Sequence, residues 1–162
     1  MNRDVTKISW DGERVKIRFE VPRTEGVDEY EMSCTDAPKP ALTKALATLR
    51  KHVAEICQFT QQYVGDMEIR GVSFSYGGDD RVMGATITAL KKLSTANAPL
   101  VVNTPHLPSA PYTDEDEAMT LLLSSECVDD LRQLQAEVLD YIDGQREQLD
   151  LLADVEPAGA AR

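Results

Sequence analysis

The chain has 162 residues, of which 42% are hydrophobic and 28% charged, a composition that suits one compact domain and excludes both a large multi-domain machine and a disordered acidic polymer. Its formal net charge of −11 lies wholly in residues 110–162, which hold 3 Lys and Arg against 14 Asp and Glu, whereas residues 1–109 hold 14 of each. The first two thirds are therefore neutral overall, and their charge does not exclude a nucleic-acid partner.

Two strands joined by a tight turn are predicted at the start of the chain. Residues 4–10 and residues 15–21 each alternate polar and apolar side chains, and Asp11-Gly12 between them is typical of a hairpin turn. Alternate residues of a strand share one face of a sheet. Three cations therefore fall on one face, either as ordinary solvated side chains or as part of a binding surface: Arg14, Lys16 and Arg18.

A third, weaker strand is expected at residues 30–34, before Pro38 and Pro40 break the chain. From Leu42 to Tyr63, apolar residues recur at steps of three and four, which predicts one amphipathic helix of about six turns. Gly65-Asp66 is expected to end this helix.

Further strands are predicted after this helix. Residues 67–76 alternate with one slip near Gly71, where a β-bulge is expected. Gly77-Gly78-Asp79-Asp80 is the turn into a long strand at residues 82–93, and a short strand at residues 99–104 is closed by Pro105.

The last third is predicted to hold one helix after an acidic segment at residues 114–117. Residues 118–123 suit a strand or a helix start, and we favour the strand, because Ser124 is typical of a helix N-cap. The helix is expected to reach about residue 150 with Gly144 as a weak interior position, and residues 151–162 are expected to be a disordered tail.

Together these elements predict an α+β fold, with antiparallel β-sheet covered by two long amphipathic helices in the order βββα-βββ(β)α. Residues 1–150 are expected to form a single compact domain. Because residues 1–65 and 66–150 share their element order, two lobes that arose by duplication are an alternative.

The cysteines and the N-terminus favour a cytoplasmic protein. Cys34, Cys57 and Cys127 are odd in number and form no CxxC motif, which favours reduced thiols, and the last two are expected in the core. No signal peptide is apparent, and no apolar run approaches the ~20 residues of a membrane helix. We therefore expect no membrane partner.

A basic sheet face is the strongest binding candidate, because single-stranded nucleic acid is held by cations interleaved with aromatic stacking platforms. Trp10, Phe74 and Tyr76 lie near the predicted cations in register, although only 6% of the residues are aromatic. The predicted nucleic-acid-binding residues are Arg14, Lys16, Arg18, Arg70, Tyr76, Arg81, Lys91 and Lys92.

A proline-punctuated loop is the second candidate. Asn103-Thr104-Pro105-His106 is the most unusual polar cluster of the chain, and loops made rigid by proline often carry binding functions. Asn103 and His106 are therefore candidate ligand-binding residues. Zinc, Ser-His-Asp and phosphate-loop patterns are absent, and we predict no metal, cofactor or catalytic residue.

The hairpin tip at Asp79-Asp80 supports an enzymatic alternative. Paired carboxylates at a hairpin tip also occur in palm-type nucleotide cyclases and polymerases, where they hold two divalent metals. A palm needs a further carboxylate, and only Asp28 or Asp36 is available, neither in a convincing strand. Gly77-Gly78-Asp79-Asp80 is also an ordinary turn sequence, because Gly and Asp favour turns.

At Leu90–Leu93, Ala98–His106 and Tyr141–Arg146 the chain resembles a group of small uncharacterised bacteriophage proteins, over roughly residues 66–148. The resemblance implies a phage protein in the bacterial host cytoplasm that acts in DNA metabolism or against a host system. The strand order of this region is also similar to that of whirly-type and coactivator-type proteins, which bind single-stranded DNA as dimers.

The sequence thus predicts a non-enzymatic binding module, a homodimer through a long helix, that binds single-stranded DNA or assists DNA recombination. A first alternative is an acidic inhibitor that binds a host protein as a nucleic-acid mimic. A second is a metal-dependent nucleotide enzyme that uses Asp79 and Asp80.

Overall fold

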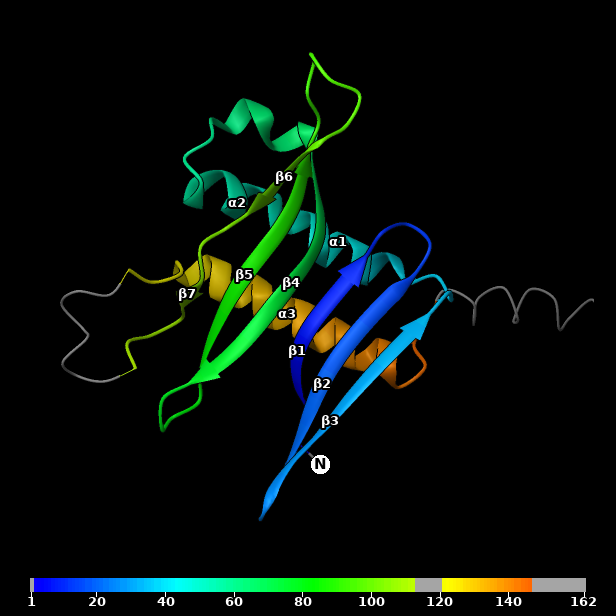
Figure 1. The fold of residues 1–162 in the computed structure, drawn as a ribbon, viewed down its shortest axis with the longest axis vertical. Helices are drawn as coiled ribbons and strands as arrows, with labels where there is room; N and C mark the ends of the chain where they lie inside the picture. Colours follow the sequence, from blue (N-terminus) through cyan, green and yellow to red (C-terminus); the bar gives the residue numbers. More distant parts are fainter. Residues whose placement is uncertain (1, 113–120, 147–162) are drawn as a thin grey trace, which may run out of the picture.

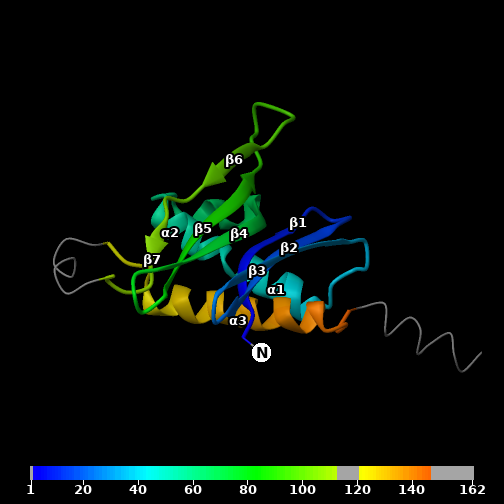
Figure 2. The same cartoon turned by 60° about the horizontal axis from the view of Figure 1, so that its bottom comes forward.

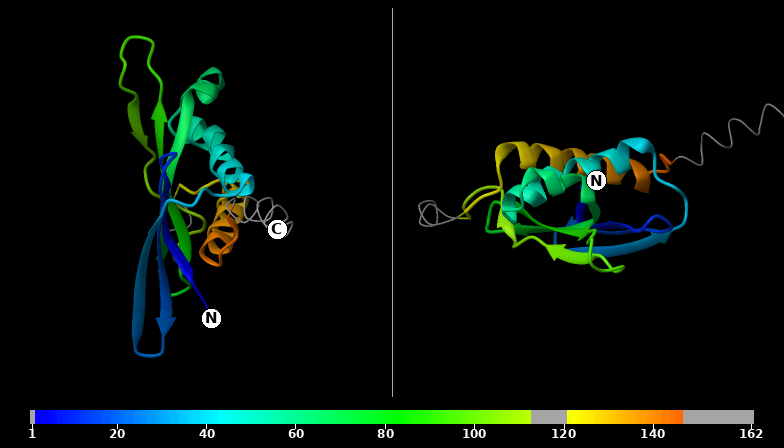
Figure 3. Two further views of the ribbon diagram at one scale, coloured as in Figure 1. Left: turned by 90° about the vertical axis from the view of Figure 1, so that its right-hand side faces the viewer. Right: turned by 90° about the horizontal axis from the view of Figure 1, so that it is seen from above.

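The computed structural model describes residues 2–112 and 121–146, which form an antiparallel sheet with helices on one of its faces (Figures 1 and 3). The strand order is β3-β2-β1-β4-β5-β6, and β7 pairs with a separate stretch of β5. The predicted α+β class is therefore confirmed. The strands are β1 (Asp4–Trp10), β2 (Val15–Arg23), β3 (Gly26–Cys34), β4 (Met67–Gly77), β5 (Val82–Lys91), β6 (Leu100–Asn103) and β7 (Leu107–Pro108).

The first three strands form a meander whose turns follow from the sequence. Gly12 adopts a φ of +95°, and the carboxylate of Asp11 accepts hydrogen bonds from the backbone N–H groups of Glu13 and Arg14. Val15 and Ile17 point into the core, while the residues between them point to the opposite face. The predicted hairpin and the weaker third strand are both confirmed.

The two halves of the sheet meet at a narrow seam between β1 and β4. Only Lys7, Ile8 and Ser9 pair with this neighbour, opposite Ser73, Val72 and Gly71. A Cβ atom at Gly71 would lie 2.5 Å from the carbonyl oxygen of Ile8, so only glycine permits this approach. The predicted bulge in β4 lies here, between Ile69 and Gly71, and is confirmed.

The helices are α1 (Pro40–Thr48), α2 (Arg50–Ile56), the 3₁₀ helix η1 (Gln61–Asp66) and α3 (Ser125–Ile142). Their apolar sides cover one face of the sheet, as Figures 2 and 3 show, and α3 extends beneath both halves. Leu131 and Leu134 of α3 and Ile8 and Ile87 of the sheet are fully buried in this interface.

The expected single helix from Leu42 to Tyr63 is wrong. The chain forms α1 and α2, which meet at Leu49, and α2 ends at Ile56, two residues before Gln58 adopts a φ of +61°. The apolar spacing of three and four continues through this corner, because both short helices bury one side on the same sheet. Periodicity therefore predicted the buried face but did not reveal the break.

The last helix begins as predicted, since the Ser124 hydroxyl accepts a hydrogen bond from the backbone N–H of Cys127. It ends at Ile142, and Gly144 follows with a φ of +99°, so this glycine terminates the helix instead of weakening its interior. Residues 121–123 form no strand, although the N–H of Leu123 donates to the Pro108 carbonyl. Residues 118–120 and the predicted tail at 151–162 lie outside the described residues.

A buried polar contact joins α2 to α3. The imidazole of His52 is 1% exposed, and its Nε2 lies 2.7 Å from a carboxylate oxygen of Asp130. Because a carboxylate only accepts, Nε2 carries the proton. Lys51, the preceding residue, forms an ion pair with Glu126 one turn earlier on α3.

Tyr76 closes the seam beyond the last β1–β4 pair. Its hydroxyl donates to the backbone carbonyl of Val5 at 2.7 Å and accepts a hydrogen bond from the side-chain amide of Gln135 on α3 at 3.0 Å. Burial raises the pKa of this phenol to about 12. The Tyr76 side chain thus links β4 to β1 and to α3 through hydrogen bonds.

We predict that Tyr76→Phe lowers the free energy of unfolding by about 1–3 kcal/mol, because it removes both hydrogen bonds of the seam. Urea denaturation at pH 7 measures the change. Tyr30→Phe is the matched control, since Tyr30 is 49% exposed, and it should leave stability nearly unchanged. Equal effects of the two substitutions would contradict the role given to Tyr76.

The cysteines differ in accessibility. Cys127 is 1% exposed, and burial, with smaller contributions from Asp130, Glu55 and Glu126, raises the pKa of its thiol to about 12. Cys57 is half-buried at the end of α2, and burial raises its thiol pKa as well. The expected core position is confirmed for Cys127 and only partly for Cys57.

We predict that iodoacetamide at pH 8 does not alkylate Cys127 in the folded protein and alkylates it readily in 6 M guanidinium, where the thiol regains a pKa near 8.5. Mass spectrometry of the alkylated peptides measures both rates. Alkylation at the same rate in both conditions would show that the thiol is accessible in the folded state.

Candidate nucleic-acid interface

The sheet has one face that no helix of the described residues covers, and Figure 1 looks onto it. We call it the open face. Most of its side chains are polar, with Leu90 and its register partner Val101 as apolar exceptions, whereas the residues that alternate with the polar ones, such as Ile17 and Ile87, are buried under the helices. A ligand can therefore reach the open face without displacing a helix.

Three cations lie together on the open face, Lys7, Lys16 and Arg18, and we call them the cationic cluster. Lys7 lies directly opposite Arg18, and Lys16 is the partner of Ser9, the next open-face residue of β1. Like charges opposite one another in a sheet are unfavourable. A single carboxylate, Glu31, lies within 3.5 Å of Arg18, so the cluster has excess positive charge that suits an anion.

The open face is not basic throughout. Glu20 and Glu29 are register partners near the β2–β3 turn, so that end of the face is acidic. On the other side of the cationic cluster the sheet presents hydroxyl and amide groups from β4, β5 and β6. These neutral residues are Ser73, Thr86, Thr88 and Asn103.

Of the predicted cations, Arg14 lies beside the cluster, since its guanidinium donates to the Ser33 hydroxyl at 3.0 Å. Arg70 is the extra residue of the β4 bulge, with Nη2 3.7 Å from Glu68, and Lys92 follows β5. Lys7 is an open-face cation that the sequence pattern did not place, because a bulge between Val5 and Lys7 changes the alternation of β1.

Three of the predicted binding residues do not belong to the open face, and their proposed grouping there is wrong. Tyr76 points to the helix side, as its bond to Gln135 shows, and Arg81 pairs with Asp4 at the seam. Lys91 lies over the ring of Tyr63 at 4.5 Å and alternates with the open-face residue Leu90.

The expected aromatic platforms are wrong as well. Phe74 is 6% exposed in the core, and Trp10 is half-buried against the helices. The strand register therefore places these rings on the covered side of the sheet. Cations and aromatic residues alternate along the strands and for that reason occupy opposite faces.

The proline-punctuated loop places both of its predicted residues on the open face. The hydroxyl of Thr88 donates to the side-chain oxygen of Asn103 at 2.6 Å, and Nε2 of His106 lies 2.6 Å from the Ser75 hydroxyl. Thr104 between them binds the backbone of Ile87 through its own hydroxyl and N–H. Ser75 and His106 are 31 residues apart, so only the folded chain brings them together.

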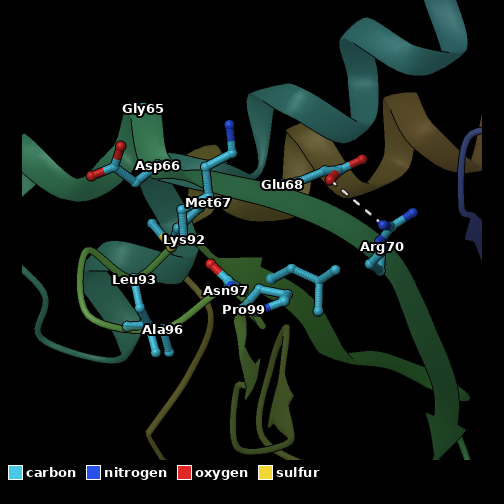
Figure 4. A pocket seen from close by; sticks show the side chains of 11 residues that line it. Gly65, Asp66, Met67, Glu68, Arg70, Lys92, Leu93, Ala96, Asn97 and Pro99 are labelled. Carbon is cyan, nitrogen blue, oxygen red and sulfur yellow. Dashed lines mark ion pairs between the residues drawn. The ribbon is translucent and has the colours of Figure 1, made fainter.

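A cavity of about 600 Å³ lies at the corner where β4 begins and β5 ends (Figure 4). The loop between β5 and β6 supplies one wall. Two of the predicted cations, Arg70 and Lys92, line the cavity. Its lining residues are Gly65, Asp66, Met67, Glu68, Arg70, Leu90, Lys92, Leu93, Ala96, Asn97 and Pro99.

The two alternatives find less support in the geometry. Asp79 and Asp80 are exposed residues of the β4–β5 turn, beside Gly78 with a φ of +72°. Within residues 2–112 and 121–146, no three His, Cys, Asp or Glu side chains are grouped to hold a metal. Two acidic residues of α3 already have partners, Glu126 with Lys51 and Asp130 with His52, and Asp143, directly after α3, pairs with Arg3.

No helix in the described part of the chain combines the length and the apolar character that crossing a membrane requires. No protein-family model, curated protein or solved structure matches this chain. The resemblance to small bacteriophage proteins therefore stays a prediction.

We predict that Gly84→Ala displaces the His106 ring. The new Cβ would lie 2.5 Å from Nε2 of His106 and 3.0 Å from the Ser75 hydroxyl, so the imidazole must move and lose its hydrogen bond to Ser75, at a cost of about 0.5–1.5 kcal/mol in stability. The ring resonances of His106 in NMR spectra report the move. Gly65→Ala is the control, because nothing lies within 4 Å of its Cβ position, and unchanged His106 resonances in Gly84→Ala would contradict the contact.

Proposed function

We propose that the protein is a non-enzymatic module that binds single-stranded nucleic acid through phosphate contacts on the open face. The observation that supports this function best is the cationic cluster of Lys7, Lys16 and Arg18 on an uncovered sheet face, where Arg18 alone of the three has an ion-pair partner, Glu31, among the described residues. Phosphate neutralisation of this kind dominates nucleic-acid affinity. The hydroxyl and amide groups of β4 to β6 are additional donors to phosphate and sugar oxygens.

The acidity of α3 is compatible with this proposal because this helix lies in the other layer. Exposed Asp129 and Asp140 belong to α3, behind the sheet as seen from the open face. At physiological salt the Debye length is about 8 Å, so exposed charges on opposite sides of the molecule are largely screened from one another. Carboxylates of α3 therefore repel phosphates on the open face only weakly.

The binding mode differs from the one that the sequence predicted. Among its described residues the open face has the exposed imidazole of His106 but no exposed Phe, Tyr or Trp ring, so stacking is not its main source of affinity. We propose contacts to the sugar–phosphate chain, with low sequence preference and strong dependence on salt. The expected homodimer stays a prediction beside this proposal.

The alternative proposal is that the exposed acidic residues of α3 bind a basic host protein in place of nucleic acid. Asp129 and Asp140 are the residues that favour it. It predicts no oligonucleotide binding, and a host protein captured by the wild type but not by a variant with both residues changed to Asn. Because Glu126 and Asp130 of α3 already form ion pairs with Lys51, we place this function second.

We predict that a labelled single-stranded oligonucleotide binds with an affinity that falls steeply with salt, measured by fluorescence anisotropy between about 50 and 200 mM salt. Lys7→Gln and Lys16→Gln should each weaken binding and lower the slope of log K against log salt by about 0.7, the value for one phosphate on a single strand. Lys44→Gln on α1 is the control in the helix layer and should change neither quantity. Absence of salt-dependent binding by the wild type at micromolar concentration would refute the proposed function.

A further inference from the structure

The cavity beside Leu90 differs from the rest of the open face because it combines apolar side chains with charged ones (Figure 4). Leu90, Leu93 and Pro99 supply the apolar part. Its volume of about 600 Å³ is within the range of small-molecule sites, about 300–1,000 Å³. A group with a flat apolar body and a polar edge suits such a lining.

The hydrogen-bond acceptors around the cavity indicate which polar groups a bound ligand would present to it. The carboxylates of Asp66 and Glu68 and the amide oxygen of Asn97 are hydrogen-bond acceptors. Cytosine offers an exocyclic amino donor at position 4, where uracil and thymine present a carbonyl oxygen, and adenine and guanine also carry an exocyclic amino group. Carbonyl oxygens facing carboxylates would be repelled.

The cations of the cavity suit a phosphate attached to that base. Arg70 is 29% exposed, and its Nη1 is buried without a hydrogen-bond partner among the described residues, while Nη2 lies 3.7 Å from Glu68. Arg70 nevertheless lines the cavity, and a phosphate oxygen is an acceptor that suits a guanidinium at its rim. Lys92 is a second cation of the cavity lining. Its backbone N–H donates to the Asp66 carbonyl, which holds Lys92 and Asp66 next to each other at the edge of the cavity.

We propose that this cavity binds one unstacked nucleotide whose base carries an exocyclic amino group. This inference rests on the proposed function, because the nucleotide would belong to a strand whose neighbouring phosphates lie along the open face. A free nucleotide has the same chemistry, and the experiment below separates the two sources. The cavity would supply base preference, which the cationic cluster alone cannot supply.

The test compares oligo-dC with oligo-dU of equal length, because these bases differ at position 4 by an amino group against a carbonyl. We expect the full-length protein to bind oligo-dC about tenfold more tightly, the effect of one well-formed hydrogen bond at a charged acceptor. Ala96→Trp, which fills the cavity, should remove this preference and leave salt-dependent binding in place. Ala98→Trp is the matched control in the same loop and outside the cavity lining, and it should keep the preference.

Each outcome is decisive for one of the two proposals. Equal binding of oligo-dC and oligo-dU by the wild type, both dependent on salt, would overturn the nucleotide cavity and leave the proposed function standing. Loss of preference in both Trp variants would also overturn it, because the effect would not be specific to the cavity. Binding of dCMP over dUMP, lost in Ala96→Trp, without binding of either oligonucleotide would support the cavity as a free-nucleotide site and refute the proposed function.

Discussion

The short pairing between β1 and β4 is the constraint on which the rest of the structure depends. Each half of the sheet is a meander with long internal pairings, but the two halves share only three residue pairs. Gly71 permits the backbones to approach, and Tyr76 closes the rest of the seam through Val5 and Gln135. Since α3 extends beneath both halves, its burial against the sheet also holds them in one plane.

This seam also creates the candidate interface. It places Lys7 and Ser9 of the first half beside Ser73 and Gly71 of the second, so that the cationic cluster and the hydroxyl-bearing strands form one continuous face. The helices all pack on the other side, because the alternating strands have one apolar face to bury. Because the apolar face of the sheet is buried, the exposed face is the mostly polar one. Its charged side chains are therefore accessible to a ligand.

The local sequence signals predicted most of the strands. Asp11-Gly12 and the Ser124 cap rest on interactions within a few residues, and the bulge near Gly71 interrupts the alternation of its own strand; each was predicted correctly. The break between α1 and α2 was missed because both helices bury the same side, so their apolar spacing is continuous. The two-residue strand β7 was missed because Leu107 and Pro108 are held by pairing with β5, which no short-range pattern reports.

The candidate site was predicted in part. Sequence alternation shows which residues of a strand share a face, but not which face the helices cover. The sequence by itself determined that Lys16 and Arg18 share a face, because side chains of a strand alternate with a period of two. Only the tertiary structure decided which face the helices cover, and with it that Tyr76 and Phe74 are on the covered side. Likewise, only the folded chain brings Ser75 to His106 and Arg70 to Lys92, since contacts between distant residues depend on sheet order and register, which alternation along one strand does not contain.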